Sequence, residues 1–258
     1  MQYFRTMRIG GLQKCSLSDF PGKVAAVIYC QGCNLRCPYC NDQELVVPQC
    51  FGPPLSEDEV IEAIKRRADR LEAVVVSGGE PTVQKELPRF LRELRDLGLA
   101  VKLDTNGTHP EMLHTLLRDA LVDYVAMDLK APLAAYAQAV GRPLSVEAIR
   151  RSVWLLRNSG VEHEFRTTAV PGMHTVRELK LIVEMINGAQ RYVIQEFVSR
   201  SPLQTGLSGR PAFPRRTIEE LRPYMERRVK EFVVRTSDDA VPMPVGRRRR
   251  APQPMPVG

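Results

Sequence analysis

The sequence lacks the features of a membrane-spanning or secreted protein. Its 258 residues contain no uninterrupted apolar run of about 18 residues, the length that suggests a bilayer-spanning helix. The first eight residues include no apolar segment like that of a secretory signal, and Met7 is as plausible a start as Met1. We therefore expect a cytoplasmic protein with no membrane contact.

Cysteine and histidine are scarce outside one short segment. The chain has six cysteines and four histidines. Without an export signal, cysteines are expected to be metal ligands or free thiols rather than disulfides. Cys33, Cys37 and Cys40 lie together with the spacing C-x3-C-x2-C, and no second Cys-x2-Cys or His-x3-His pair follows them. The other three cysteines receive no assigned role: Cys15, Cys30 and Cys50.

Positive charge is concentrated at the end of the chain. The net charge is +7, and Arg247 to Arg250 supply four of these positive charges. The surrounding residues 237–258 repeat the sequence Pro-Met-Pro-Val-Gly and cannot bury a core. We therefore predict one domain over residues 1–236 and a disordered tail over 237–258. Nucleic-acid binding is not expected, because the rest of the chain carries a net charge of only +3 (7 − 4), which is usual for a solvated surface.

The body of the chain alternates between short β-branched segments and longer segments with helical periodicity. This alternation is typical of right-handed βαβ units and a parallel sheet. We therefore predict an α/β fold, a partial or full (β/α) barrel of about six parallel strands. The predicted strands are 24–29, 73–76, 101–103, 124–127, 164–170 and 192–198, with a further candidate at 232–234.

Three predicted helices begin with a capping box, in which Ser or Thr is followed three residues later by Glu. The remaining helices are predicted from their apolar stripes, over residues 87–97, 111–117 and 146–156. The three capping boxes are Ser56 with Glu59, Thr175 with Glu178, and Thr217 with Glu220.

Polar motifs follow the predicted strands at their carboxyl ends. They are residues 77–81 (Ser-Gly-Gly-Glu-Pro), 104–107 (Asp-Thr-Asn-Gly) and 128–130 (Asp-Leu-Lys). In parallel α/β barrels the chemistry is at this end of the strands. We therefore expect these motifs to meet the cysteine segment at one site.

Three neighbouring cysteines are too few for a closed metal site. A four-iron cluster normally takes one cysteine per iron, so three leave one iron open. One alternative is a structural zinc site, in which Cys30 joins the other three as two Cys-x2-Cys pairs. A simple electron-transfer cluster is another, but no fourth cysteine has ferredoxin-like spacing.

The cysteine spacing, with Tyr39 just before Cys40, resembles the radical S-adenosylmethionine (SAM) superfamily. The Gly-Gly-Glu-Pro motif resembles the superfamily's second motif, and the resemblance runs from about Gly10 to about Thr236. It implies a 4Fe-4S cluster on the three cysteines, with SAM chelating the open iron through its amino and carboxylate groups. Tyr39 is then expected near the adenine of SAM, and Gly78, Gly79 and Glu80 near its methionine end.

Residues 11–22 and the two later strand-end motifs are similar to glycyl-radical enzyme activases. This resemblance implies that SAM is bound by Asp104, Thr105, Asp128, Lys130 and Arg166. It also implies a monovalent cation near Asp104, Thr105, Met127 and Asp128. His174 and Gln195 are weaker candidates. No catalytic residue is expected beyond the cluster and SAM.

The resemblance implies a hydrogen abstraction from a glycine of a partner protein. The best match is to activating proteins of anaerobic ribonucleoside-triphosphate reductase, with reduced flavodoxin or ferredoxin as electron donor. No inserted multi-cysteine domain occurs, so no additional cluster is expected. The long loop 199–216 is a candidate docking segment. The alternatives are a radical SAM enzyme acting on a small molecule or RNA, and a zinc-binding interaction module.

Overall fold

The computed structural model describes residues 6–198 and 202–236. The predicted tail over 237–258 lies outside the described residues. Within them, no helix is long and apolar enough to cross a membrane.

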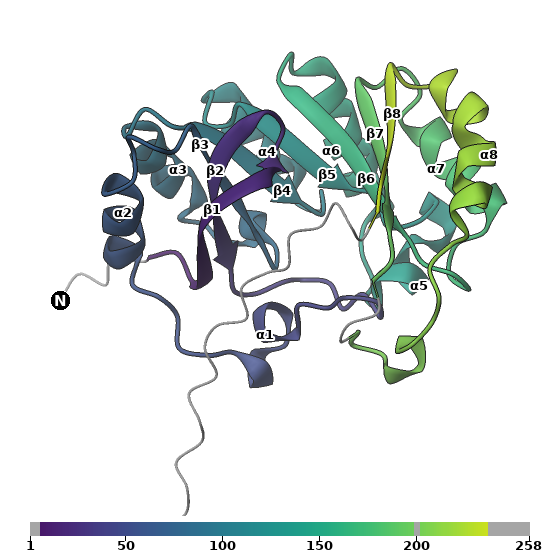
Figure 1. Cartoon of the computed structure of the whole chain (residues 1–258), viewed down its shortest axis with the longest axis horizontal. Helices are drawn as coiled ribbons and strands as arrows, with labels where there is room; N and C mark the ends of the chain where they lie inside the picture. Colours follow the sequence, from purple (N-terminus) through teal and green to yellow (C-terminus); the bar gives the residue numbers. More distant parts are fainter. Residues whose placement is uncertain (1–5, 199–201, 237–258) are drawn as a thin grey trace, which may run out of the picture.

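One eight-stranded sheet forms the centre of the fold, and its strands follow one another in chain order (Figure 1). The first two strands are antiparallel, and every later neighbouring pair is parallel. The strands are β1 Ile9–Phe20, β2 Lys23–Cys30, β3 Ala73–Gly78, β4 Ala100–Thr105, β5 Tyr124–Asp128, β6 Glu162–Ala169, β7 Arg191–Glu196 and β8 Glu231–Arg235.

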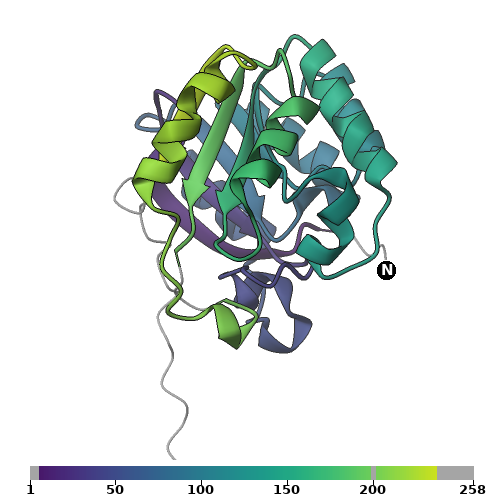
Figure 2. The same cartoon turned by 90° about the vertical axis from the view of Figure 1, so that its right-hand side faces the viewer.

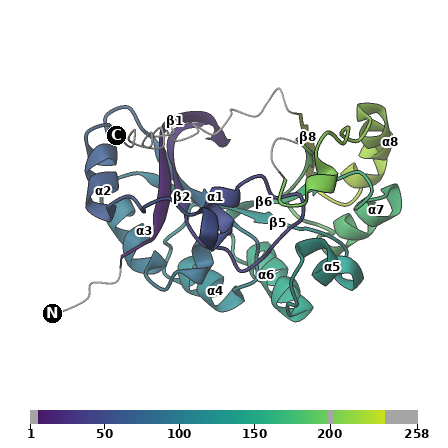
Figure 3. The same ribbon diagram turned by 90° about the horizontal axis from the view of Figure 1, so that it is seen from below.

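Helices cover the outer face of the curved sheet, as the view from below shows (Figure 3). Their apolar stripes form the main core against the strands; Phe90, Leu91 and Leu94 of α3, for example, are fully buried. The helices are α1 Gln43–Val46, α2 Glu57–Lys65, α3 Leu87–Arg95, α4 Pro110–Arg118, α5 Tyr136–Val140, α6 Val146–Asn158, α7 Val176–Met185 and α8 Arg215–Glu226.

The predicted α/β partial barrel is confirmed, with seven parallel strands rather than about six. The strands β1 and β8 lie at opposite ends of the sheet order, and no pairing joins them among residues 6–198 and 202–236. The barrel is therefore open on one side. Figure 2 shows β8 beside β7 at one edge of the sheet, with α8 packed next to it.

Three local expectations are wrong. No strand was predicted at β1, where register shifts interrupt the alternation of buried and exposed residues. The side chain of Ser56 makes no capping hydrogen bond to α2. Helix α8 begins at Arg215, two residues before the predicted Thr217, because Pro214 occupies the N-cap. The capping box of Thr175 and Glu178 is confirmed.

Candidate active site

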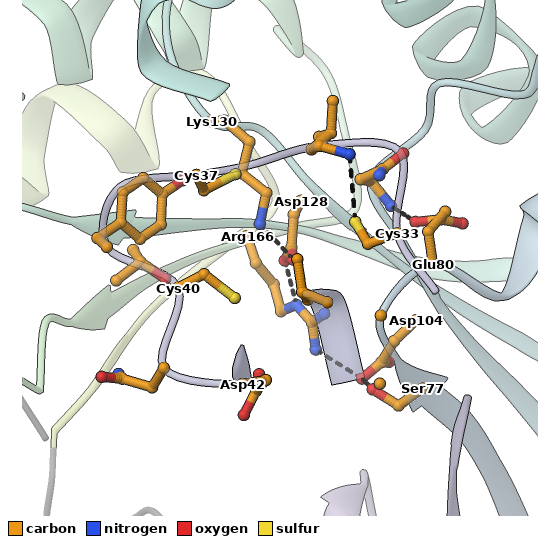
Figure 4. A pocket seen from close by; sticks show the side chains of 18 of the residues that line it. Cys33, Cys37, Cys40, Asp42, Ser77, Glu80, Asp104, Asp128, Lys130 and Arg166 are labelled. Atoms are coloured by element: carbon orange, nitrogen blue, oxygen red, sulfur yellow. Dashed lines mark hydrogen bonds and ion pairs between the residues drawn. The ribbon is translucent and has the colours of Figure 1, made fainter. Parts of the chain in front are cut away.

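A cavity of about 440 Å³ opens at the carboxyl ends of the strands. Its wall is built from the cysteine loop that follows β2 and from the ends of β3 to β7. Figure 4 shows the three motif cysteines and the strand-end carboxylates around this one space. The volume lies in the range typical of small-molecule sites, about 300–1,000 Å³. The structure thus brings the sequence motifs together as expected.

Cys33, Cys37 and Cys40 all line this cavity, whereas Cys30 does not. Cys30 is fully buried in the main core at the end of β2. A zinc site of four cysteines would need the Cys30 thiol to turn toward the other three. This arrangement disfavours the zinc alternative.

The cysteine loop is held by backbone hydrogen bonds to segments on both sides. The N–H of Gly32 donates to Leu45 at 2.8 Å, and the N–H of Arg36 donates to Val140 at 2.9 Å. Gly141, with φ +64°, lies so close to Arg36 that a Cβ there would be 2.4 Å from its carbonyl oxygen. The loop therefore has a fixed path around the cavity.

Burial keeps the cysteine thiols protonated in the absence of a cation. It raises the pKa of Cys33 to about 11 and that of Cys40 to about 12. A bound metal reverses this, because a coordinating thiol is deprotonated. The thiols therefore suit a group that carries its own positive charge.

The spacing of the thiols suits a cluster better than a single ion. Among residues 6–198 and 202–236, no three His, Cys, Asp or Glu side chains could hold one metal ion. A zinc ion with Zn–S bonds of about 2.3 Å holds its sulfurs about 3.8 Å apart. In a four-iron cluster each cysteine binds a different iron, so the thiolates stand farther apart. Three thiols around one cavity fit that donor set.

The two glycines after β3 are required by contact with the cysteine loop. Gly78 has φ +105°, and a Cβ there would lie 2.5 Å from the backbone nitrogen of Cys30. A Cβ on Gly79 would lie 2.2 Å from the carbonyl oxygen of Gly32. Both residues also line the cavity. Their predicted contact with SAM stays a prediction, while their close packing against the loop is a direct feature of the fold.

Glu80 joins the turns after β3 and β4. Its carboxylate, buried in the protein, accepts hydrogen bonds from the Thr105 hydroxyl at 2.7 Å and the Asn106 N–H at 2.6 Å. The N–H of Thr82 donates to the same group at 3.1 Å. Both carboxylate oxygens are thus engaged by the protein, so Glu80 acts first as a clamp that aligns the two turns.

Arg166 bridges the two strand-end aspartates. Its Nε donates to Asp128 at 2.8 Å, and its Nη1 donates to Asp104 at 3.2 Å. Lys130 pairs with Asp128 at 2.8 Å, and Lys102 pairs with Asp104 at 2.9 Å. The dashed lines in Figure 4 trace the Arg166 part of this network. Arg166 also lines the cavity, so its predicted contact with SAM stays a prediction beside the ion pairs that the structure shows.

The five-residue network carries more positive than negative charge. Burial alone would raise the pKa of Asp104, but Arg166 and Lys102 outweigh it and hold that pKa well below its usual range. Burial likewise opposes ionisation of Asp128, and the cations Arg166 and Lys130 hold its pKa low. Two carboxylates are therefore neutralised by three cations. Lys102 does not line the cavity, so the network presents two cations to it, Arg166 and Lys130, beside Asp104 and Asp128. The predicted monovalent cation stays a prediction.

His174 supports Lys130 from behind rather than facing the cavity. Its buried ring accepts from the N–H of Val170 at 3.0 Å, and its Nε2 lies 2.9 Å from the carbonyl oxygen of Lys130. The ammonium of Lys130 lies 6.0 Å from the ring centre of Tyr39, which lines the cavity. His174 thus helps to position Lys130.

Sequence reasoning missed several members of the site. Ser77 donates to Asp104 at 3.0 Å, and buried Lys102 neutralises the same carboxylate. Asp42 and Thr168 line the cavity and were not predicted. Strand alternation offered a signal for Lys102, because it lies two residues before Asp104 and so on the same face.

The comparison with protein families finds a match that includes the cysteine loop and the ends of β3 to β6. Residues 27–186 match the family model of the Radical SAM superfamily. The chain belongs to the radical SAM superfamily. Membership implies a 4Fe-4S cluster and SAM as cofactors, which agrees with the three cysteines that line the cavity.

A candidate glycyl-radical enzyme activating enzyme of Methanocaldococcus jannaschii is 31% identical over 235 residues. The match covers 88% of this chain and 95% of that relative. A 7-carboxy-7-deazaguanine synthase of Hyperthermus butylicus is 34% identical over 134 residues, covering 48% of this chain and 56% of that enzyme.

Solved structures show the same fold at low sequence identity. Streptococcus suis SuiB bound to S-adenosylmethionine matches with a TM-score of 0.62 and 15% identity, covering 81% of this chain. The chain spans about half of SuiB, 49% of its length. A structure of TYW1 with a lysine-pyruvate adduct matches with a TM-score of 0.55 and 16% identity, covering 78% of this chain and 72% of that one.

Proposed function

We propose that this radical SAM enzyme is a glycyl-radical enzyme activase, and that its partner is an anaerobic ribonucleotide reductase. The observation that best supports this proposal is the similarity to the candidate activase of M. jannaschii, because the match spans 95% of that relative. The relative that makes a small molecule, 7-carboxy-7-deazaguanine synthase, matches only 48% of this chain.

The proposed reaction moves one hydrogen atom. When bound, the cluster supplies one electron that breaks the C5′–S bond of SAM. A hydrogen atom from a glycine Cα of the partner joins the 5′ carbon. The products are methionine, 5′-deoxyadenosine and the glycyl radical. The electron comes from reduced flavodoxin or ferredoxin.

The chain's residues hold and orient the reactants. Cys33, Cys37 and Cys40 hold the cluster, and the cations Arg166 and Lys130 orient the SAM carboxylate. Fixed positions matter here, because orientation of bound reactants supplies a large part of a rate enhancement.

The loop after β7 lies against the cysteine loop, which supports docking of a partner at this position. The N–H of Leu203 donates to Cys40 at 3.0 Å, and the N–H of Gln204 donates to Pro38 at 2.9 Å. A protein that contacts this segment would therefore stand next to the proposed cluster.

Deuterium transfer tests the proposal. The candidate reductase is prepared with α-deuterated glycine and incubated anaerobically with the reconstituted activase, reductant and SAM. We expect deuterium in 5′-deoxyadenosine, in proportion to the glycyl radical formed. If 5′-deoxyadenosine forms without deuterium while the radical is absent, glycine of this reductase is not the hydrogen donor.

The small-molecule alternative keeps one supporting observation, the 34% identity with 7-carboxy-7-deazaguanine synthase over 134 residues. The same assay, run with a purine or pterin in place of the reductase, addresses it. Faster 5′-deoxyadenosine formation with such a compound than with the reductase would favour this alternative. The RNA alternative depends on the arginine-rich tail, which lies outside the described residues.

A further inference from the structure

The cavity wall contains two kinds of polar side chain. The strand-end residues around Arg166 bond to one another, as described above. Asp42, Thr168 and Gln195 line the same cavity, yet their side chains make no hydrogen bond or ion pair within the described residues. The first set bonds within itself. The second set makes no such bond among the described residues, although the positive charge of Lys130 acts on Asp42.

The Asp42 side chain makes no hydrogen bond to the backbone of α1, although it lies at the start of that helix. It is the N-cap of α1, a place where aspartate normally accepts from the helix backbone. Here its φ is −97° and ψ is 52°, and its side chain makes no capping hydrogen bond. Figure 4 shows Asp42 on the Cys40 side of the cavity, apart from Cys33 and Glu80.

Thr168 and Gln195 form a pair nearer the cavity mouth than Arg166. They are register partners on the neighbouring strands β6 and β7. Thr168 lies two residues after Arg166, so it is on the same face of β6 and one step closer to the carboxyl end. The two side chains thus stand side by side above the cationic network.

Asn41 ties the Asp42 segment to the end of β7. The Asn41 Nδ2 donates to the carbonyl of Val198 at 2.8 Å, three residues beyond Gln195. The cysteine loop and the β6–β7 end therefore meet on one side of the cavity. Asp42, Thr168 and Gln195 belong to this side, which we name the outer wall.

We propose that the outer wall binds the backbone of an extended polypeptide at the reactive glycine. A carboxylate oxygen accepts hydrogen bonds, so Asp42 suits a backbone N–H. The amide of Gln195 both donates and accepts, as a peptide group does, and the hydroxyl of Thr168 can do either. Glycine has no side chain, so a site that recognises it must contact the peptide backbone. This inference rests on the proposed activase function and names how its substrate is held.

The charge of the outer wall separates this substrate class from nucleotides. The Asp42 carboxylate repels a phosphate, whereas it attracts the N–H dipoles of a peptide. A phosphate group placed beside Asp42 would therefore meet an unfavourable charge.

The test compares Asp42→Ala and Gln195→Ala with Glu44→Ala, an exposed control on α1. Glycyl-radical formation is measured against the concentration of the candidate anaerobic reductase. We expect KM for the reductase to rise about 10- to 100-fold in each outer-wall variant, the usual effect of losing a hydrogen bond to a charged or buried group. Asp42→Asn should recover part of the loss, and Glu44→Ala should match the wild type.

A structural effect is distinguished by two further measurements on the same variants, iron content and SAM affinity. An unchanged KM, or a fall in SAM affinity as large as the rise in KM, overturns the proposal. A peptide spanning the reactive glycine should compete with the reductase, and N-methylation of that glycine should weaken competition in the wild type but not in Asp42→Ala. Equal weakening in both overturns the assignment of Asp42. If the wild type itself gives no radical, the activase function fails, and this inference with it.

Discussion

Replacement of Gly79 by alanine tests the contact between the glycine turn and the cysteine loop. The new Cβ would lie 2.2 Å from the Gly32 carbonyl oxygen and 3.1 Å from that of Leu45. Ordinary contact begins near 3.4 Å, so the Gly32 carbonyl must retreat by about 1.2 Å. That movement stretches its 2.8 Å hydrogen bond from the N–H of Glu80.

Two costs add in this variant. Overpacking of a tight contact costs about 1–3 kcal/mol, and a lost backbone hydrogen bond costs about 1 kcal/mol. The expected loss in the free energy of unfolding is about 2–4 kcal/mol, and Tm should fall by about 4–16 °C. Urea and thermal unfolding of the metal-free protein measure this loss directly.

Gly206→Ala is the matched control, because a Cβ at Gly206 has no neighbour within 4 Å. Its unfolding free energy should stay within about 0.5 kcal/mol of the wild type. Equal stability of Gly79→Ala and Gly206→Ala would refute the close contact. Iron uptake should also fall in Gly79→Ala alone, because the displaced Gly32 begins the cysteine loop.

Three further predictions concern the cysteines and the buried ion pairs. After anaerobic reconstitution, Cys30→Ser should keep the iron and sulfide of the wild type, whereas Cys37→Ser should lose them; equal loss would restore the four-cysteine alternative. Glu164→Gln should lower the free energy of unfolding in urea by about 3–5 kcal/mol, because the fully buried carboxylate pairs with an arginine of β8 at 2.9 Å. Arg216→Met removes an exposed ion pair and should lower it by less than about 0.5 kcal/mol. Similar losses in the two variants would contradict this prediction. Arg166→Lys should weaken SAM binding, measured by equilibrium dialysis, about tenfold or more, since a lysine cannot bond both aspartates, and unchanged affinity would remove Arg166 from the SAM site.

The parallel sheet could be predicted because its strands are short apolar runs separated by helical stripes. Residues 73–76 and 124–127, for example, lie inside β3 and β5. The edge strand β1 could not, because its pairing with β2 contains register shifts that break the two-residue period.

The cap of α2 was missed for a different reason. Ser56 does occupy the N-cap of α2, but its side chain makes no capping hydrogen bond. In the first turn, the buried carboxylate of Glu57 accepts from the N–H of Met7 at 2.8 Å and pairs with Arg89. Tertiary contacts here take precedence over a local capping pattern.

Some parts of the candidate site could likewise be predicted from the sequence, and others could not. The cysteines and the residues at strand ends could be predicted, because their spacing and strand positions are local features. The partners of Asp104 could not, since Ser77 and Arg166 reach it from other strands. The unpartnered state of Asp42 depends on side-chain direction, which no sequence pattern shows.

The most direct test of the proposed function is electron paramagnetic resonance of the candidate anaerobic reductase. The reductase is incubated without oxygen with reconstituted activase, reductant and SAM. The account predicts a glycyl-radical doublet that requires SAM and all of Cys33, Cys37 and Cys40, together with methionine and 5′-deoxyadenosine. Cleavage of SAM with no doublet in the reductase would contradict it.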